Sequence, residues 1–292
     1  MHPTLQKLLA SGPVVTDGAW GTQLQALGLA GGDCPDEWNL THPDQVAAVA
    51  RAYVEAGSQV ILSNTFRSNA VALAGYGLAG RVVELNRAGA AISSRAAAGK
   101  ALVFASVGPS GKMLMTGEVT QDTLRSAFEE QAQALAEGGA DGLAVETMSD
   151  LAEAIIAVAA AKATGLPVVA TMVFDSGKNK DRTMMGNTPE QAAEALAAAG
   201  ADVIGANCGS GIAGYLPVCR RLRQASDKPV WIKANAGLPE IVDGKLVYQN
   251  TPQDFAALAP ALIEAGASFI GGCCGTDPDF VRALKRKVSG CA

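Results

Sequence analysis

Three cysteines have the type and spacing to bind a metal ion. Cys208 lies in the run GANCGSG, and the adjacent pair Cys273 and Cys274 lies in the run FIGGCCGT. Each run follows a short apolar stretch typical of a buried β-strand, and each is flanked by glycine. If the fold brings the two strand ends together, three thiolates can hold a zinc ion whose fourth position stays open. Such an ion deprotonates a thiol that binds to it, so the pattern predicts chemistry on a sulfur nucleophile.

An all-sulfur site of this kind favours alkyl transfer to sulfur over hydrolysis. Hydrolytic zinc sites usually have histidine or carboxylate ligands and a separate general base. The only histidines are His2 and His42, which leaves too few for a multi-histidine metal site. The remaining cysteines, Cys34, Cys219 and Cys291, are interpreted as ordinary reduced thiols, since free cysteine behaves as a small apolar residue.

A recurring phrase indicates which elements position these residues. An Ala/Leu-rich helix end, a glycine and an apolar strand follow one another in residues 53–64, 135–146, 196–207 and 262–273. The glycines of the four phrases are Gly57, Gly139, Gly200 and Gly266. A glycine at this point takes the left-handed backbone that ends a helix, so each phrase predicts a helix followed by a strand.

Four further strand-like runs lie at residues 13–18, 101–108, 166–174 and 228–235. Eight apolar strands that alternate with helical segments predict a parallel sheet buried on both faces. This number of units in one chain of 292 residues predicts a single (β/α)8 TIM barrel over residues 1–292, with a doubly wound open sheet as the alternative. Chemistry in such a barrel lies beyond the strand C-termini, where the polar residues are Asp17, Asn64, Ser106, Glu146, Asp175, Asn207 and Asn235.

Composition narrows the class of protein. The formal net charge is −5 without a basic run, which argues against nucleic acid as a partner. No stretch approaches the roughly 18 apolar residues of a membrane span, and the first residues lack the pattern of a secretory signal. The expectation is a cytoplasmic enzyme that binds no membrane.

Several runs together resemble a known family. They are TDGAWGTQLQ (16–25), NTF (64–66), VETM (145–148), GANCG (205–209), NAGLP (235–239) and GGCCGT (271–276). Over residues 13–285 the chain resembles the zinc-dependent homocysteine S-methyltransferases. It is most similar to their bacterial betaine-using members and to the homocysteine modules of methionine synthases. The resemblance implies a TIM barrel with Zn²⁺ held by Cys208, Cys273 and Cys274, and homocysteine bound to the metal through sulfur and methylated to methionine.

The resemblance also implies roles for residues around the metal. Asp17 and Gly18 match the segment that lines the amino-acid pocket, and Glu146 matches the carboxylate that takes the homocysteine ammonium. Asn207 and Asn235 are expected to position the zinc loops or the substrate carboxylate, although buried asparagines also serve simply to satisfy backbone groups.

The methyl donor is less well defined by sequence. Relatives use betaine, S-methylmethionine, S-adenosylmethionine or a corrinoid carrier. Trp38, in a run that resembles the betaine-using branch, could face a quaternary ammonium. Arg67 and Thr147, however, stand where the animal betaine enzymes have tyrosines, which leaves Trp20 and Trp38 as the aromatic candidates. Arg67 could instead bind a carboxylate of the donor or of the acceptor.

Three interpretations therefore stay open. The first is methyl transfer from a small onium donor to homocysteine. The second is a methyltransferase subunit that uses another thiol or a separate corrinoid protein. The third is a non-catalytic zinc-binding barrel, in which a fourth cysteine such as Cys34 would close the metal site. A homo-oligomer is compatible with each interpretation.

Overall fold

Eight short parallel strands form the centre of the structure, a computed structural model that describes residues 1–242 and 245–290. The strands are β1 (Val14–Val15), β2 (Val60–Ile61), β3 (Leu102–Val107), β4 (Gly142–Met148), β5 (Val168–Met172), β6 (Val203–Cys208), β7 (Val230–Ala234) and β10 (Ala267–Gly272). Their order in the sheet is β1-β10-β7-β6-β5-β4-β3-β2. A parallel bridge between Thr16 and Val60 joins the two ends, so the sheet closes into the predicted barrel and the open-sheet alternative is wrong.

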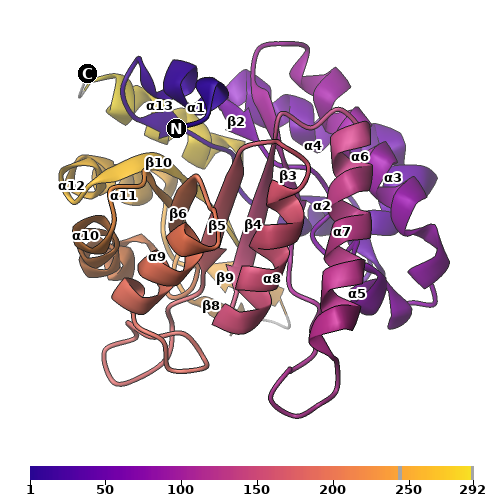
Figure 1. The fold of residues 1–292 in the computed structure, drawn as a ribbon. Coiled ribbons are helices and arrows are strands. Elements are labelled where there is room, and N and C mark those ends of the chain that lie inside the picture. Colours follow the sequence, from indigo (N-terminus) through magenta and orange to yellow (C-terminus); the bar gives the residue numbers. More distant parts are fainter. Residues whose placement is uncertain (243–244, 291–292) are drawn as a thin grey trace.

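Helices surround the barrel (Figure 1). They are α1 (Pro3–Leu9), α2 (Gly21–Ala26), α3 (Trp38–Thr41), α4 (Pro43–Ala56), α5 (Ala70–Ala74), α6 (Val82–Ala97), α7 (Gln121–Glu137), α8 (Leu151–Lys162), α9 (Pro189–Ala198), α10 (Tyr215–Ala225), α11 (Pro252–Ala257), α12 (Ala259–Glu264) and α13 (Pro278–Ser289). Short 3-10 turns occur at Pro35–Glu37, Ala79–Arg81 and Ile212–Gly214. Each barrel strand is thus followed by at least one helix, which is the predicted (β/α)8 pattern.

The predicted helix ends are confirmed. Gly57, Gly139, Gly200 and Gly266 have φ angles of 103°, 91°, 103° and 107°. Only a residue without a Cβ adopts this backbone at little cost, so the recurring glycine ends each helix and turns the chain into the next strand.

The two ends of the barrel differ. Helix α1 lies across the end where the strands begin, and its Leu5 joins an apolar cluster with inward side chains that include Phe104, Trp231 and Phe269. The Trp231 ring lies with its centroid 5.0 Å from that of Phe269. Apolar side chains therefore fill this end of the barrel.

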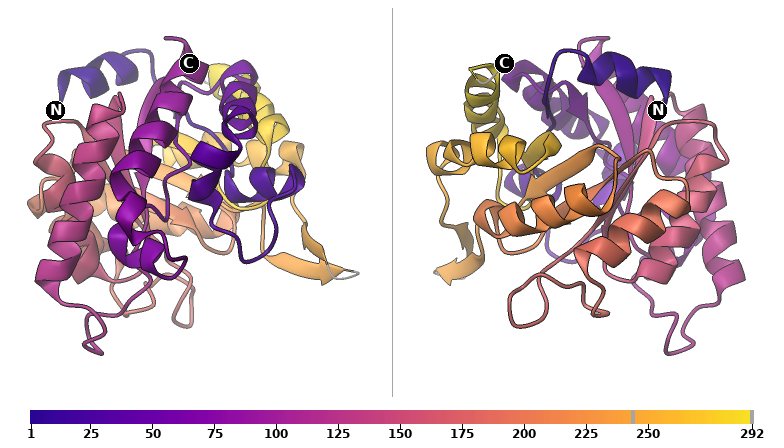
Figure 2. Two further views of the ribbon diagram at one scale, coloured as in Figure 1. Left: turned by 90° about the vertical axis from the view of Figure 1, so that its right-hand side faces the viewer. Right: turned by 60° about the vertical axis from the view of Figure 1, so that its left-hand side comes forward.

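A two-stranded hairpin was not anticipated from the sequence. Strands β8 (Pro239–Val242) and β9 (Lys245–Tyr248) pair antiparallel between β7 and α11. Figure 2 shows the hairpin standing away from the barrel on the side of the strand C-termini. Within the described residues, no helix combines the length and apolarity needed to cross a bilayer.

Candidate active site

The three cysteines meet because β7 lies between the two strands that carry them. In the sheet register, Cys208 of β6 and Gly272 of β10 both pair with Ala234 of β7. The amide N of Cys273 donates to the carbonyl O of Ala234 over 2.7 Å, which fixes the start of the second cysteine run. As a result the three sulfur atoms lie within 4.8 Å of one another.

The backbone at Cys208 is strained and held by neighbouring polar groups. Cys208 has φ 66°, in the left-handed region that non-glycine residues seldom occupy. The Tyr215 hydroxyl donates to the carbonyl O of Asn207 over 2.7 Å, and Asn235 Nδ2 donates to the carbonyl O of Gly209 over 2.6 Å. These two contacts on either side of Cys208 keep its sulfur directed at the other two.

The three thiols of the cluster affect one another's ionisation. The Cys273 and Cys274 thiols donate to the Cys208 sulfur, and these bonds lower the pKa of Cys208. The same hydrogen bonds raise the pKa of Cys273 and that of Cys274, because each of these thiols would have to ionise beside the Cys208 thiolate. One thiolate therefore forms more readily than a second or a third, and a bound cation would offset the repulsion between them.

Glu146, near the end of β4, is buried beside the cysteines. Ser106 Oγ donates to one carboxylate oxygen, and Asn207 Nδ2 lies 3.4 Å from the other. Burial raises the pKa of Glu146 to about 7, against the opposing effect of the Lys233 ammonium. A cationic ligand group at this carboxylate would keep it ionised.

Asp17 forms a buried ion pair that was not predicted. Its carboxylate accepts hydrogen bonds from Lys233 Nζ, from Trp20 Nε1 at 2.8 Å and from the amide N of Leu62 at 2.7 Å. Burial alone lowers the pKa of Lys233, but the carboxylates of Asp17 and Glu146 outweigh it and the pKa is raised. A lysine in the otherwise apolar strand VWIKA was the one sequence signal for this pair.

These groups surround one cavity of about 390 Å³. Its lining includes Gly18, Trp20, Arg67, Glu146, Thr147, Lys233 and all three cysteines. Among the predicted residues, Asp17, Asn207 and Asn235 are not in this lining. Asp17 and Asn207 contact Trp20, Lys233 and Glu146, which do line it, whereas Asn235 bonds to Gly209 beside Cys208. The Oδ1 atom of Asn235 is buried without a hydrogen-bond partner.

The sequence of the chain also matches a family model. Residues 14–288 match the family model described as homocysteine S-methyltransferase. The chain belongs to this family.

Family relatives are similar in sequence or in fold. Methionine synthase of Mycobacterium leprae is 33% identical over 303 residues, and that of Mycobacterium tuberculosis is 33% identical over 304 residues. Each match covers 98% of this chain but 25% of the relative, so the chain spans about a quarter of these proteins. The metallated form of the homocysteine methyltransferase MmuM from Escherichia coli superposes on this chain with a TM-score of 0.81 and is 23% identical in sequence. The superposition covers 97% of this chain and 99% of MmuM, so the two share a fold.

In this member of the homocysteine S-methyltransferase family, Trp38 does not line the cavity at the cysteines. Its ring stacks on His42 with centroids 4.4 Å apart, and it packs into the core between the barrel and the helices. The short helix α3 turns this side chain toward the core instead of the strand ends, so the predicted contact of Trp38 with a donor is not supported by its position. Trp20 is the tryptophan that lines the cavity.

The remaining cysteines do not approach the cluster. Cys34 packs with Leu73 and Leu85, and Cys219 lies 3.6 Å from the carbonyl O of Ala265. Cys291 falls outside the described residues. Among residues 1–242 and 245–290, the three clustered cysteines are the one group of three or more ligands placed to share a metal ion.

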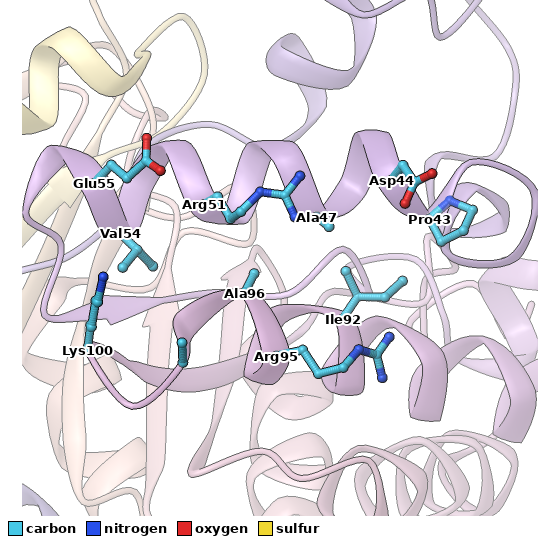
Figure 3. A pocket seen from close by; sticks show the side chains of 11 residues that line it. Pro43, Asp44, Ala47, Arg51, Val54, Glu55, Ile92, Arg95, Ala96 and Lys100 are labelled. Atoms are coloured by element: carbon cyan, nitrogen blue, oxygen red, sulfur yellow. The ribbon is translucent and has the colours of Figure 1, made fainter.

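A separate groove of about 440 Å³ lies between α4 and α6 and is shown in Figure 3. Arg51 and Arg95 extend along it from the two helices. None of the predicted site residues lines this groove.

Proposed function

We propose that the chain transfers a methyl group from a small onium donor to the sulfur of homocysteine, giving methionine, with Zn²⁺ as its metal. The observation that carries the proposal is the group of three sulfur atoms within 4.8 Å of one another, at a cavity that Glu146 also lines. Family membership supports the same acceptor.

The cysteine cluster suits zinc. Tetrahedral zinc with Zn–S bonds of about 2.3 Å places its sulfur ligands about 3.8 Å apart. Sulfur atoms within 4.8 Å reach that spacing when the cluster contracts by at most about 1 Å. Three thiolates also favour zinc over Ca²⁺ or Mg²⁺, which prefer oxygen ligands. A zinc ion held by Cys208, Cys273 and Cys274 would supply the charge that keeps an acceptor thiol deprotonated at neutral pH.

Charge in the barrel interior favours an amino-acid thiol as acceptor. Asp17 and Glu146 supply two buried carboxylates, and Lys233 supplies one ammonium that is bonded to Asp17. Glu146 is left without a cation bonded to it, and its raised pKa of about 7 means that it is only partly ionised before a cationic group binds. An acceptor ammonium would neutralise it, which is worth more in a buried site than in water.

Methyl transfer then requires little further chemistry from the protein. The acceptor sulfur attacks the methyl carbon in line with the leaving group, the S–C bond forms as the onium–C bond breaks, and the donor leaves as a neutral amine or thioether. Trp20, Leu62 and Phe66 line the cavity and exclude water from the path. The walls hold the two substrates in the attack geometry. A general base is not needed for this step.

A donor panel tests the proposal. The zinc-loaded protein would be given homocysteine with betaine, dimethylsulfoniopropionate, S-methylmethionine, S-adenosylmethionine or methylcobalamin, and methionine would be measured. We expect turnover with one small onium donor. Turnover with methylcobalamin alone would instead favour the alternative in which a separate corrinoid protein is the methyl donor.

X-ray absorption at the zinc edge separates catalysis from a closed structural site. We expect the metal to gain a sulfur ligand when homocysteine is added, because only three cysteines among the described residues are placed to bind it. Four protein sulfur ligands with no change on adding thiol, together with a silent donor panel, would favour the non-catalytic interpretation. Turnover of another thiol with homocysteine inactive would correct the acceptor.

A further inference from the structure

Arg67 lies where the catalytic cavity meets a second hollow. The 390 Å³ cavity at the cysteines and an adjoining groove of about 750 Å³ share two lining residues, Phe66 and Arg67. The groove runs between the segment after β2 and the segment after β3, so it opens at the end of the barrel where substrates enter. Pockets for small ligands are typically about 300–1,000 Å³. The cavity is at the small end of that range, and a donor that reacts there has room to extend into the groove.

The backbone of Arg67 is held by buried neighbours. Asp36 Oδ1 accepts hydrogen bonds from the amide N of Arg67 at 2.9 Å and from Ser68 Oγ at 2.6 Å. Asn86 Nδ2 donates to the carbonyl O of Ser68 over 2.8 Å. Arg67 is itself exposed, although the residues that follow it are buried. The structure thus presents one arginine from a fixed backbone, which lowers the entropy cost of binding with it.

The Arg67 guanidinium is close enough to Asp36 for its charge to oppose the rise in the pKa of that carboxyl, but the two form no ion pair. Within the described residues, no carboxylate oxygen lies within 4.0 Å of its nitrogen atoms in an ion pair. The groove beside it has a largely apolar lining that includes Val71 and Pro109, with a second cation at Lys112. Lys112 has an exposed partner at 3.9 Å in Glu118, a weak pair in water. A largely apolar groove beside a guanidinium that forms no direct ion pair matches a short methylene chain that carries a carboxylate.

We propose that Arg67 determines donor specificity by binding the carboxylate of the methyl donor, whose tail lies in this groove. The inference rests on the proposed function. The carboxylate bound by Arg67 belongs to the donor, because the ammonium and carboxylate of homocysteine are attached to one carbon. An acceptor held at Glu146 therefore keeps both groups at the buried end of the cavity, near Lys233, while Arg67 lies at the exposed end.

The test compares a carboxylate donor with its neutral amide. Kinetic constants would be measured with zinc-loaded protein and homocysteine, using dimethylsulfoniopropionate and its carboxamide, in the wild type, Arg67→Gln, Arg67→Lys and Arg95→Gln. Arg95 lies on the groove of Figure 3 and serves as the matched arginine control. Calorimetric titration of the same two compounds without homocysteine measures binding in the absence of turnover.

We expect the wild type to prefer the acid, and Arg67→Gln to reduce that preference at least about tenfold through the KM of the acid, as expected for loss of a charge-assisted hydrogen bond. The acid-to-amide preference of Arg67→Lys should lie between those of the wild type and Arg67→Gln, because lysine keeps the charge but lacks the planar guanidinium. The preference of Arg95→Gln should match that of the wild type. An unchanged acid-to-amide ratio in Arg67→Gln, a wild type without preference, or a rise confined to the homocysteine KM would overturn the proposal. If no donor is turned over, the proposed function fails while the calorimetric comparison still decides the role of Arg67.

Discussion

At the scale of single residues, one asparagine connects the metal ligands to the acceptor site. Asn207 precedes Cys208 in the chain, and its side-chain Oδ1 accepts from the amide N of Thr147 at 2.7 Å and from Thr171 Oγ1 at 2.6 Å. Thr147 and Cys208 both have left-handed backbones, with φ 61° and 66°. Such residues cost about 1–3 kcal/mol each and persist only where their surroundings hold them. Asn207 thus fixes the strand ends that carry Glu146 and Cys208 relative to one another.

Substitution of Cys273 tests the metal assignment. We expect Cys273→Ala to lose zinc and activity while the barrel stays folded, because Cys273 is not among the side chains of the apolar core clusters. The fall in zinc affinity should exceed the roughly 10–100-fold that loss of an outer-sphere contact causes. Zinc content, methionine formation and circular dichroism measure the three properties. Cys219→Ala, which removes a buried thiol far from the cluster, should keep both zinc and activity, and an unfolded Cys273→Ala would instead make the metal structural.

Substitution of Glu146 tests how the acceptor is bound. Glu146→Gln keeps the shape of the side chain and its bond with Ser106 but removes the charge. We expect the KM for homocysteine to rise about 10–100-fold, which corresponds to a lost charged hydrogen bond of about 1.5–3 kcal/mol. Glu153→Gln is the matched control for the homocysteine KM, since Glu153 is a buried carboxylate that does not line the cavity at the cysteines. Its partner Ser110 lines only the adjoining groove. An unchanged homocysteine KM in Glu146→Gln would refute the assigned role.

At the scale of elements, β7 organises the site. It pairs with β6 on one side and β10 on the other, which brings the two cysteine runs to the same level. Its inward side chains change from Trp231 in the closed end to Lys233 at the cavity. The close approach of β6 depends on Gly205, where an added Cβ would lie 1.9 Å from the carbonyl O of Trp231.

Gly205→Ala therefore tests the position of β6. Because the clash is with backbone of a central strand, we expect a loss of at least about 1–3 kcal/mol in the free energy of unfolding, together with weaker zinc binding from a displaced Cys208. Urea denaturation and metal content measure the two effects. Gly290→Ala is the control, since its Cβ would come no closer than 3.6 Å to another atom. A Gly205→Ala protein as stable as the wild type would show that β6 can shift without cost.

At the scale of the whole molecule, stability and function occupy opposite ends of one barrel. The end closed by α1 is apolar, whereas the open end carries buried charges and strained backbone. Asp36 is one of those charges. It is buried at the edge of the cavity, and burial raises its pKa to about 6 despite hydrogen bonds from Ser68 and Arg67.

The raised pKa of Asp36 makes stability depend on pH. A folded-state pKa above the value of 3.8 of an unperturbed aspartate means that the contribution of Asp36 is fully present below pH 3.8 and is lost as pH rises through about 6. We expect Asp36→Asn to gain stability relative to the wild type over that window, by at most about 3 kcal/mol. Urea unfolding at pH 4.5 and pH 7.5 measures the change. Asp33→Asn, at an exposed side chain, is the control, and a difference between Asp36→Asn and wild type that is the same at both pH values would contradict the prediction.

Local sequence patterns were sufficient to determine the repeating architecture. Apolar runs predict strands, and Gly57 and its equivalents predict helix ends, because each signal depends on residues close in the chain. Eight such units favoured a barrel over an open sheet, and the bridge between Thr16 and Val60 decided between the two. The apolar runs that precede the cysteines and Glu146 predicted that these residues lie at strand C-termini. A parallel barrel brings all strand C-termini to one end.

Contacts between distant residues were decided only by the tertiary structure. Lys233 and Asp17 lie 216 positions apart, and their pairing depends on the order of strands in the closed sheet. Trp20 and Trp38 are both aromatic residues near the first strand, but the rotation of short helices sends one to the cavity and the other to the core. Side-chain direction at a loop or short helix is set by what packs against it, and those partners come from other parts of the chain.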